Sequence, residues 1–160
     1  MLEATFKMFE PFLEKVPIVF TAKGSIFGMV LVVYFGKLLH VLTSFIYLKK
    51  YNNINGATPF SGDSITYEKK IVNRALAAHR NHWEAFAVFS LGMTLAVIAG
   101  KDSGELTKLG NAFLYVRVIY NFIYIAAANE PLSALRSASF MAGFVILARI
   151  YSIAIPEMWA

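Results

Sequence analysis

The chain has 160 residues, of which 58% are hydrophobic and only 16% are charged, and its formal net charge is +5. Soluble domains carry roughly 25% charged residues, so a soluble core of this size would leave too much apolar surface in water, and a membrane protein is expected. The basic residues lie at the ends of apolar segments, which argues against nucleic acid as a partner, and the absence of cysteine excludes disulfides and Cys-ligated metals.

Residues 1–24 are expected to form an N-terminal segment that lies at the membrane interface. Their Phe and Leu residues favour the interface. Three glutamates and the breaks at Pro11 and Pro17 leave no continuous apolar stretch of the kind found in a signal peptide. The first membrane span is therefore expected to direct the chain to the membrane.

Four apolar segments are predicted to cross the membrane as helices, at about residues 25–48, 75–100, 109–128 and 134–155. The first is roughly 36 Å long, enough for a hydrocarbon core of about 30 Å. The second is expected to be helical from near Tyr67, but its purely apolar part is only roughly 22 Å long, so polar turns should lie partly at membrane depth. Ser133 is the expected N-cap of the fourth. The fold class is thus an all-α membrane four-helix bundle forming one domain over residues 1–160.

The distribution of Lys and Arg predicts the orientation of these spans. The connection between spans one and two, with its flanks, has six basic residues, and the start of the fourth span, on the same side of the membrane, adds Arg136. The segments on the opposite side carry five lysines. Cytoplasmic loops carry the excess of positive charge. The connections between spans one and two and between spans three and four are therefore expected in the cytoplasm, with both termini opposite. The six are Lys49, Lys50, Lys69, Lys70, Arg74 and Arg80.

Ionisable side chains inside the spans point to a site, because each costs about 2.5–3.5 kcal/mol at the bilayer centre. On the second span Arg74, Asn81 and Glu84 lie close to one helical stripe. A second stripe on the third span and the start of the fourth add further polar groups at the same cytoplasmic depth, so a polar pocket between helices is expected there. These further groups are Arg117, Tyr120, Asn121, Tyr124, Arg136 and Ser137.

Structural interpretations compete with this site. Arg80 and Glu84 are an i, i+4 pair that can simply neutralise two charges, and tyrosines near helix ends often anchor a helix at the interface. Lys37 is expected to be structural and Arg149 to lie at the interface. The histidines follow no recognised metal spacing, so no metal site is expected.

Three short motifs resemble the MAPEG family, the membrane-associated proteins of eicosanoid and glutathione metabolism. The segment AAHRNHWEAFAVF carries the pattern A-H-x-N-x-x-E, RVIYNFIY begins at Arg117, and RSASF begins at Arg136. Their order, spacing and positions on the helices agree with the family, and in particular with its microsomal glutathione transferases. The resemblance covers the second to fourth spans well and the first span weakly.

This resemblance implies a four-helix protomer that assembles as a homotrimer, with glutathione bound as co-substrate between neighbouring protomers near the cytoplasmic side. Asn81 and Glu84 would hold the glutathione backbone and amino group, and Arg80 would meet a carboxylate. Arg136 and Ser137, in the first turn of the fourth span, would be catalytic and face the sulfur, where the helix N-terminus also favours an anion. The implied lining residues from the third span are Arg117, Tyr120 and Tyr124.

The sequence departs from the family at two positions. Glutathione-binding members usually carry an arginine two residues before the motif histidine, and this chain has Ala77 there. The arginine of the family's first helix falls on Lys49 or Lys50, which keep a charge without bidentate geometry. Arg74 is expected to replace part of the lost charge at the glutathione site.

The expected function is therefore a glutathione-dependent membrane transferase or peroxidase that acts on a hydrophobic electrophile or lipid hydroperoxide. Two alternatives belong to other classes. One is a non-catalytic scaffold or subunit of a larger membrane complex that keeps the fold, and the other is a lipid-binding protein whose pocket takes an anionic headgroup. Ala77 favours these alternatives, whereas the retained polar residues favour the enzyme.

Overall fold

The computed structural model describes residues 7, 10–48, 66–101 and 103–158 of the chain. The described part has long α-helices and no β-strand, as the sequence predicts. The long helices are α2 (Ala22–Leu48), α3 (Tyr67–Ile98), α4 (Gly104–Ala126) and α5 (Glu130–Ala154), and the short 3₁₀ helix η1 (Pro156–Met158) follows α5.

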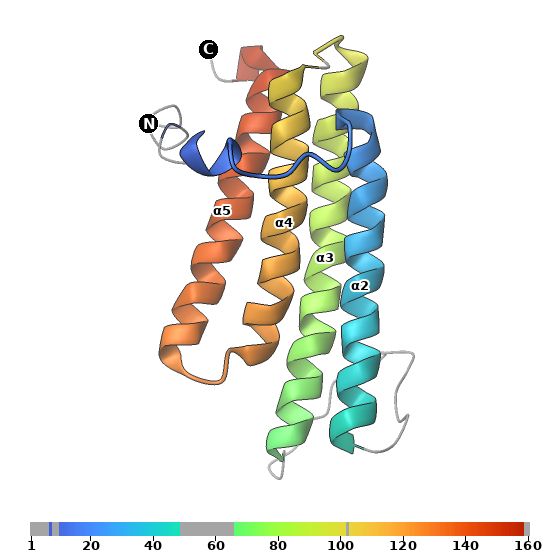
Figure 1. Cartoon of the computed structure of the whole chain (residues 1–160), viewed down its shortest axis with the longest axis vertical. Coiled ribbons are helices and arrows are strands. Elements are labelled where there is room, and N and C mark those ends of the chain that lie inside the picture. The colour runs from blue at the N-terminus through green and yellow to red at the C-terminus, as the bar shows by residue number, and fades with distance from the viewer. Residues whose placement is uncertain (1–6, 8–9, 49–65, 102, 159–160) are drawn as a thin grey trace.

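The long helices lie side by side and alternate in direction along the long axis of the molecule (Figure 1). Helix α4 packs against α2, α3 and α5, and α3 also packs against α2 and α5, whereas α2 does not pack against α5. Helices α3 and α4 therefore form the centre. The first half of α3, the end of α4 and the start of α5 come together at one end of the molecule (Figure 1).

Side-chain caps explain where three of the helices begin. The hydroxyl of Ser103 accepts a hydrogen bond from the amide of Leu106 (3.2 Å), and the side chain of Asn129 accepts one from the amide of Leu132 (3.1 Å). Thr66 caps α3 in the same way. The prediction that Ser133 is the N-cap was wrong. Asn129, four residues before Ser133, accepts from the amide of Leu132, and Pro131 fits the first turn of the helix.

Three helices are long and apolar enough to cross a membrane among the described residues, namely α2, α4 and α5. Helix α3 is not among them, because its first half carries charged and polar side chains. It does begin at Tyr67, where the sequence places its start. The crossing of the membrane by α3 thus stays a prediction, and so does the four-span arrangement.

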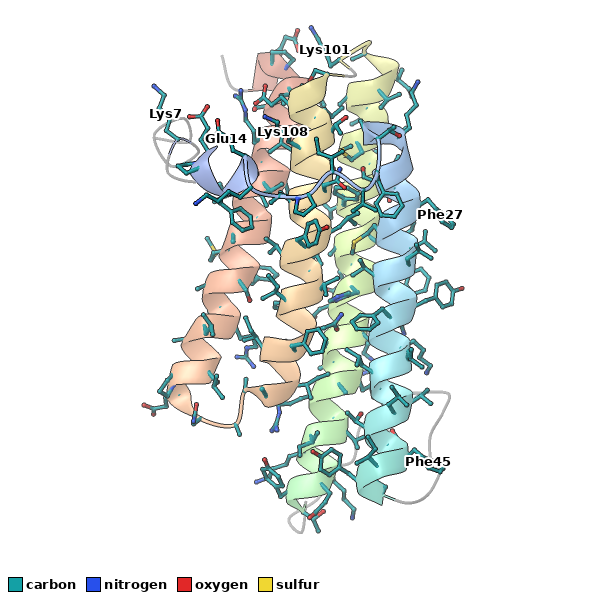
Figure 2. All side chains as sticks on the ribbon, in the orientation of Figure 1. Lys7, Glu14, Phe27, Phe45, Lys101 and Lys108 are labelled. Atoms are coloured by element: carbon teal, nitrogen blue, oxygen red, sulfur yellow. The ribbon has the colours of Figure 1, made fainter. Side chains whose placement is uncertain are left out.

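Large apolar side chains point outward as well as inward. Inside, the rings of Phe89 and Phe113 stack at 4.6 Å between centroids. Outside, Phe27 and Phe45 are 61% and 65% exposed and point away from the helices (Figure 2). Lys101 and Lys108 lie at one end of the molecule instead (Figure 2). An apolar middle with charged ends is suited to a hydrocarbon layer bounded by water.

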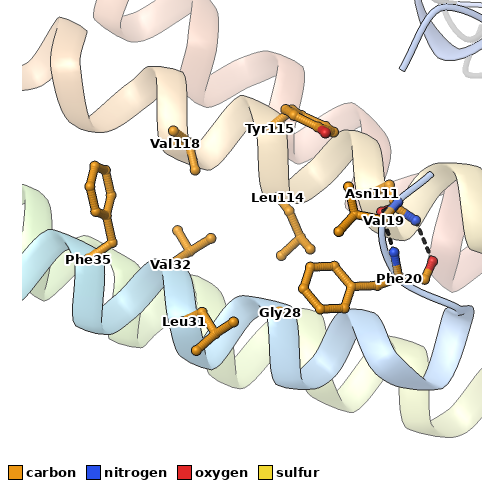
Figure 3. Close-up of a pocket in the computed structure, with 10 residues that line it drawn as sticks. All are labelled: Val19, Phe20, Gly28, Leu31, Val32, Phe35, Asn111, Leu114, Tyr115 and Val118. Atoms are coloured by element: carbon orange, nitrogen blue, oxygen red, sulfur yellow. Dashed lines mark hydrogen bonds between the residues drawn. The ribbon is translucent and has the colours of Figure 1, made fainter. Parts of the chain in front are cut away.

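Asn111 fastens the chain before α2 onto α4. Its side-chain oxygen accepts hydrogen bonds from the amides of Val19 (2.9 Å) and Phe20 (3.0 Å), and its amide nitrogen donates to the carbonyls of Phe20 (2.7 Å) and Thr107 (2.8 Å). This segment crosses over α4 (Figures 1 and 3). The interfacial position of residues 1–24 stays a prediction, and residues 1–6 and 8–9 lie outside the described part.

Candidate functional site

A polar pocket of about 290 Å³ lies where α3, α4 and α5 meet. Asn81 comes from α3, Tyr120 and Tyr124 come from α4, and Arg136 and Ser137 come from α5. The sequence predicted all five as site residues, and the fold brings them to one place. Phe140 and Met141 complete the lining.

Contacts inside the polar pocket hold its aromatic and amide groups in place. The amide nitrogen of Asn81 donates to the hydroxyl of Tyr120 at 2.9 Å. The rings of Tyr120 and Tyr124 meet edge to face with centroids 5.3 Å apart. The guanidinium carbon of Arg136 lies 5.0 Å from the centroid of the Tyr124 ring, a cation–π contact that orients the arginine without neutralising it.

Arg136 and Ser137 lie deeper in their helix than the sequence suggests. Helix α5 begins at Glu130, so these residues follow the N-cap Asn129 by seven and eight positions, at the end of the second turn and the start of the third. The prediction that they sit in the first turn was wrong, because the helix extends back through the connection that the hydropathy pattern assigns to a loop. The attraction of a helix end for an anion fades beyond the first turn. Any anion here must therefore depend on the side chains themselves.

Arg117 is a buried cation beside Tyr120, one of the residues that line the polar pocket. Its side chain is only 3% exposed, and Nη2 donates to the backbone carbonyl of Asn81 at 2.7 Å. Its guanidinium carbon lies 5.0 Å from the centroid of Tyr120 and 5.7 Å from that of Phe113. Among the described residues the Nε–H group has no hydrogen-bond partner. A buried donor without a partner is costly, and this one has almost no accessible surface, so a ligand atom would reach it only if the pocket wall rearranged.

A second, larger space adjoins the polar pocket, and we call it the apolar pocket. It has a volume of about 390 Å³ between α3, α4 and α5. Asn81 and Phe140 line both pockets, while Glu84 and Arg117 line the apolar pocket only. The remaining walls are Ala85, Val88, Phe113, Gly143, Phe144, Leu147, Ala148 and Tyr151.

Arg74 and Arg80, both predicted to bind glutathione, line neither pocket. The Nε of Arg74 donates to the carbonyl of Ile125 at 2.8 Å and so joins α3 to the last turn of α4. Arg80 is exposed on α3. It belongs to the lining of neither pocket, although the adjacent residue Asn81 lines both.

His82 and Asn121 are buried polar residues whose structural role the sequence did not identify. The amide nitrogen of Asn121 lies 2.9 Å from Nε2 of His82, which also approaches the carbonyl of Arg117 at 3.2 Å. Asn121 belongs to the same sequence stripe as Tyr120, yet it faces Gly36 of α2, whose Cβ, if present, would lie 3.3 Å away. The residues of this stripe therefore have different roles. Tyr120 and Tyr124 line the polar pocket, whereas Asn121 connects α4 to α3.

The opposite end of the molecule carries an ion pair. Nη2 of Arg149 on α5 lies 2.7 Å from the carboxylate of Glu105 on α4, and Nε of the same arginine donates to that carboxylate at 2.8 Å. Both side chains are partly exposed. This pair joins the two helices away from the polar pocket.

A further apolar pocket of about 250 Å³ lies between α2 and α4, under the segment before α2 (Figure 3). Leu31, Val32, Phe35 and Leu114 form much of its wall. Asn111 also lines it, but that side chain is fully engaged with backbone groups. Tyr115 then supplies the remaining polar side chain of the lining, and no charged side chain belongs to it. With one hydroxyl to recognise a ligand, this pocket is a weaker candidate than the pair formed by α3, α4 and α5.

Comparison with known proteins gives a result for the family and none for individual relatives. Neither the search of curated proteins nor the search of solved structures gave a match. The model of the MAPEG family matches residues 26–155, which include all of α3, α4 and α5 with their pocket residues. Because the match extends over most of the chain, this protein belongs to the MAPEG family.

Proposed function

We propose that the protein is a glutathione-dependent membrane transferase that joins the glutathione thiolate to a hydrophobic electrophile. The observation that carries the proposal is the convergence of Asn81, Tyr120, Tyr124, Arg136 and Ser137 on one pocket from three helices. Membership of the MAPEG family supports it, since that family includes glutathione transferases and peroxidases as well as non-catalytic members.

The proposed roles follow from what each group can hold. Glu84 carries a carboxylate for the glutathione amino group, and Asn81 offers amide groups for its peptide backbone. Arg117 lines the apolar pocket with a guanidinium, a group that can donate to a carboxylate or carbonyl oxygen of the ligand. Arg136 and Ser137 are proposed to face the sulfur. The guanidinium can donate to a thiolate, and the Ser137 hydroxyl, which donates to the carbonyl of Ser133 at 3.2 Å, would have to turn from that carbonyl to do so.

The chemical demand on Arg136 is moderate. A free thiol has a pKa near 8.5, so lowering it by two units requires about 2.7 kcal/mol of preference for the anion. One guanidinium in a partly dry site, with a hydroxyl beside it, can supply this preference. The thiolate lone pair then forms the C–S bond, while the displaced electron pair leaves with the departing group or with the oxygen of an opened epoxide, which takes up one proton.

The same activated thiolate supports a peroxidase reaction on a lipid hydroperoxide. Sulfur would take the outer oxygen, the released alkoxide would take a proton to give the alcohol, and a second glutathione would convert the sulfenic acid to a disulfide and water. Both reactions use the same residues for thiolate formation.

One observation favours a non-catalytic member of the family instead. Ala77 removes the arginine that family members use for glutathione, and Arg74, the residue expected to replace its charge, donates instead to the carbonyl of Ile125. Affinity for glutathione therefore rests on fewer cations. A scaffold or subunit of a membrane complex is the second candidate.

Thermal unfolding in detergent tests the proposal directly. Binding at a concentration of about a hundred times Kd stabilises a folded protein by about 2.7 kcal/mol. Glutathione should raise the midpoint of unfolding, and an ultraviolet thiolate signal should appear on binding. Ophthalmic acid, which has a methyl group in place of the thiol, should stabilise without that signal. If glutathione neither stabilises the protein nor forms thiolate, the transferase proposal is wrong and the scaffold takes its place.

A further inference from the structure

The pocket of about 250 Å³ between α2 and α4 lies apart from the candidate site (Figure 3). It shares no lining residue with the polar pocket or with the apolar pocket. Leu31 and Val19, which belong to its lining, are 47% and 64% exposed, so the pocket opens on the side of the molecule. That side is apolar, and a molecule that enters here therefore comes from the hydrocarbon layer of the membrane.

The segment before α2 forms a roof over one end of this pocket. Its residues Val19 and Phe20 line the pocket, and their amides donate to the side-chain oxygen of Asn111 at 2.9 and 3.0 Å. On α4 the lining extends from Asn111 to Val118, about 10 Å at 1.5 Å per residue. An α-helix with its side chains is about 10–12 Å wide, too wide for a space of about 250 Å³ beneath a fixed roof. A hydrocarbon chain fits instead, because an apolar cavity of about 150 Å³ is enough for benzene.

This pocket has a polar end and an apolar end. The ring of Tyr115 points toward Asn111, whereas Phe35 and Val118 lie at the opposite end (Figure 3). The Asn111 side chain is engaged with backbone groups, so the Tyr115 hydroxyl is the group that can meet a polar atom of a ligand. Asn111 lies nearer to the start of α4, and the polar end is therefore directed toward an end of the molecule. A matching ligand is a hydrocarbon chain whose polar atoms lie on that side.

A cation lies beyond the polar end of the pocket. Lys108, Asn111 and Tyr115 follow one another at i, i+3 and i+7 on α4 and so share one face of the helix. Lys108 is exposed and lies near the end of the molecule (Figure 2). The acidic residue one turn before it, Glu105, pairs with Arg149 of α5. A phosphate at the polar end of the ligand would thus meet a positive charge, as lipid headgroups do beside basic residues at a membrane surface.

We infer that the pocket between α2 and α4 binds a membrane phospholipid, with one acyl chain between the helices and the phosphate beside Lys108. The Tyr115 hydroxyl would donate to the ester carbonyl of that chain. Such a lipid is bound for structure and is not a substrate, because no residue of the candidate site lines this pocket. It would hold the segment before α2 against both helices. The inference does not depend on the proposed transferase function.

Narrowing the pocket tests the place of the acyl chain. Native mass spectrometry of the detergent-solubilised protein with phosphatidylglycerol that carries palmitoyl and oleoyl chains should show one retained lipid per protein chain. Leu31→Phe should lower this retention about tenfold, since a packed apolar pocket discriminates against single methylene groups by about that factor. Val118→Phe narrows the pocket from α4 and should act in the same way if Leu31→Phe fails to fold. Leu38→Phe is the matched control, because Leu38 lies seven residues farther along α2, is 51% exposed and does not line the pocket.

Reversing one charge tests the place of the phosphate. Lys108→Glu should lower the retention of phosphatidylglycerol about tenfold, because it replaces an attraction by a repulsion. Diacylglycerol with the same chains lacks the phosphate, so wild type should retain less of it, and this variant should retain as much of it as wild type. Lys101→Glu makes the same charge change at the same end of the molecule (Figure 2) and should leave both retentions unchanged.

Photolabelling gives the position of the lipid directly. A phosphatidylglycerol with a diazirine halfway along one chain should label α2 or α4 near Phe35 or Val118, and Leu31→Phe should reduce this labelling whereas Leu38→Phe should not. Labelling confined to α5, or equal retention in Leu31→Phe, Val118→Phe and Leu38→Phe, overturns the chain site. Equal retention of diacylglycerol and phosphatidylglycerol, with no effect of Lys108→Glu, overturns the assignment of a phospholipid as the occupant.

Discussion

At the scale of single residues, Asn81 connects the two pockets. Its side-chain amide donates to Tyr120 of the polar pocket, and its backbone carbonyl accepts from Arg117 of the apolar pocket. One α3 residue therefore orients a hydroxyl and a guanidinium on α4. Arg136, by contrast, contacts the face of the Tyr124 ring, and this contact uses none of its N–H donors.

Arg136→Ala should weaken the ultraviolet thiolate signal of bound glutathione and slow conjugation by about 10²-fold, the usual effect of removing one electrostatic stabiliser. Arg136→Lys should restore part of the rate, because it keeps the charge but loses the planar donor pattern. The measurement is stopped-flow absorbance of the thiolate followed by turnover with a generic electrophile.

Arg149→Ala is the matched control for this prediction. Arg149 lies on the same helix, but it pairs with Glu105 at the other end of the molecule. It should lower thermal stability slightly, since partly exposed ion pairs contribute about 0–1 kcal/mol, and it should leave the thiolate signal intact. If instead Arg136→Ala prevents folding and the residual folded protein conjugates normally, Arg136 has a structural role.

At the scale of the elements, α2 and α4 approach closely where small residues face each other. A Cβ on Gly110 would lie 2.7 Å from the hydroxyl oxygen of Ser25, and a Cβ on Gly28 would lie 2.6 Å from Leu114. Close backbone approach of this kind strengthens packing between apolar helices. Asn111 follows Gly110 and uses the same close region to hold the chain that leads into α2.

Asn111→Leu should release that leading segment from α4. Four hydrogen bonds are lost, and the backbone groups of Phe20 and its neighbours lose their partners, so the free energy of unfolding should fall by about 1–3 kcal/mol. Limited proteolysis should cut before Ala22 faster than in wild type. Glutathione binding should be unchanged, because the polar pocket lies at the other end of the molecule. If the variant is cut no faster than wild type, Asn111 does not hold this segment on α4.

At the scale of the whole molecule, the exposed apolar side chains and the position of Arg80 are relevant to whether several copies of the chain form an oligomer. Intramembrane charges are surrounded by protein or water rather than lipid, and Arg80, which is exposed on α3, lines neither pocket of its own chain. We expect a homotrimer in which α2, α3 and α5 form the interfaces. Arg80 would then reach a carboxylate of glutathione bound at a neighbouring protomer.

The trimer is tested by mass measurement in mild detergent together with chemical crosslinking. Three copies are expected, and a monomeric mass confirmed by crosslinking would contradict the prediction. Mixing active protomers with Arg80→Ala protomers adds a functional measurement: activity should fall out of proportion to the variant's share if this residue serves a neighbour's site.

Orientation in the membrane is predicted from Lys and Arg alone. The connection between α2 and α3 and that between α4 and α5 should be cytoplasmic, with the turn between α3 and α4 on the other side. Because the chain has no cysteine, Asn55→Cys and Ser103→Cys can each be labelled without a background signal. Labelling of both from the same side refutes this topology. Residues 49–65, which include Asn55, lie outside the described part of the structure.

The sequence by itself determined the features that depend on composition and helical period. It predicted a helical membrane protein, the start of α3 at Tyr67, and the polar residues that line the pocket. These predictions were correct because the hydrophobic content of a segment and the helical repeat of 3.6 residues can both be read from neighbouring residues in the sequence. Membership of the family was likewise predicted from short motifs and confirmed by the family model.

Only the tertiary structure decided which neighbours share a site. It left Arg80 outside the pockets that Asn81 lines and separated Asn121 from Tyr120, because the direction of each side chain depends on the rotation of its helix against its neighbours. It placed Arg136 in the second turn of α5, since Asn129 and Pro131 allow the helix to begin before the apolar residues. The apolar pocket also appears only in the packed structure, because its walls are ordinary hydrophobic residues from three helices.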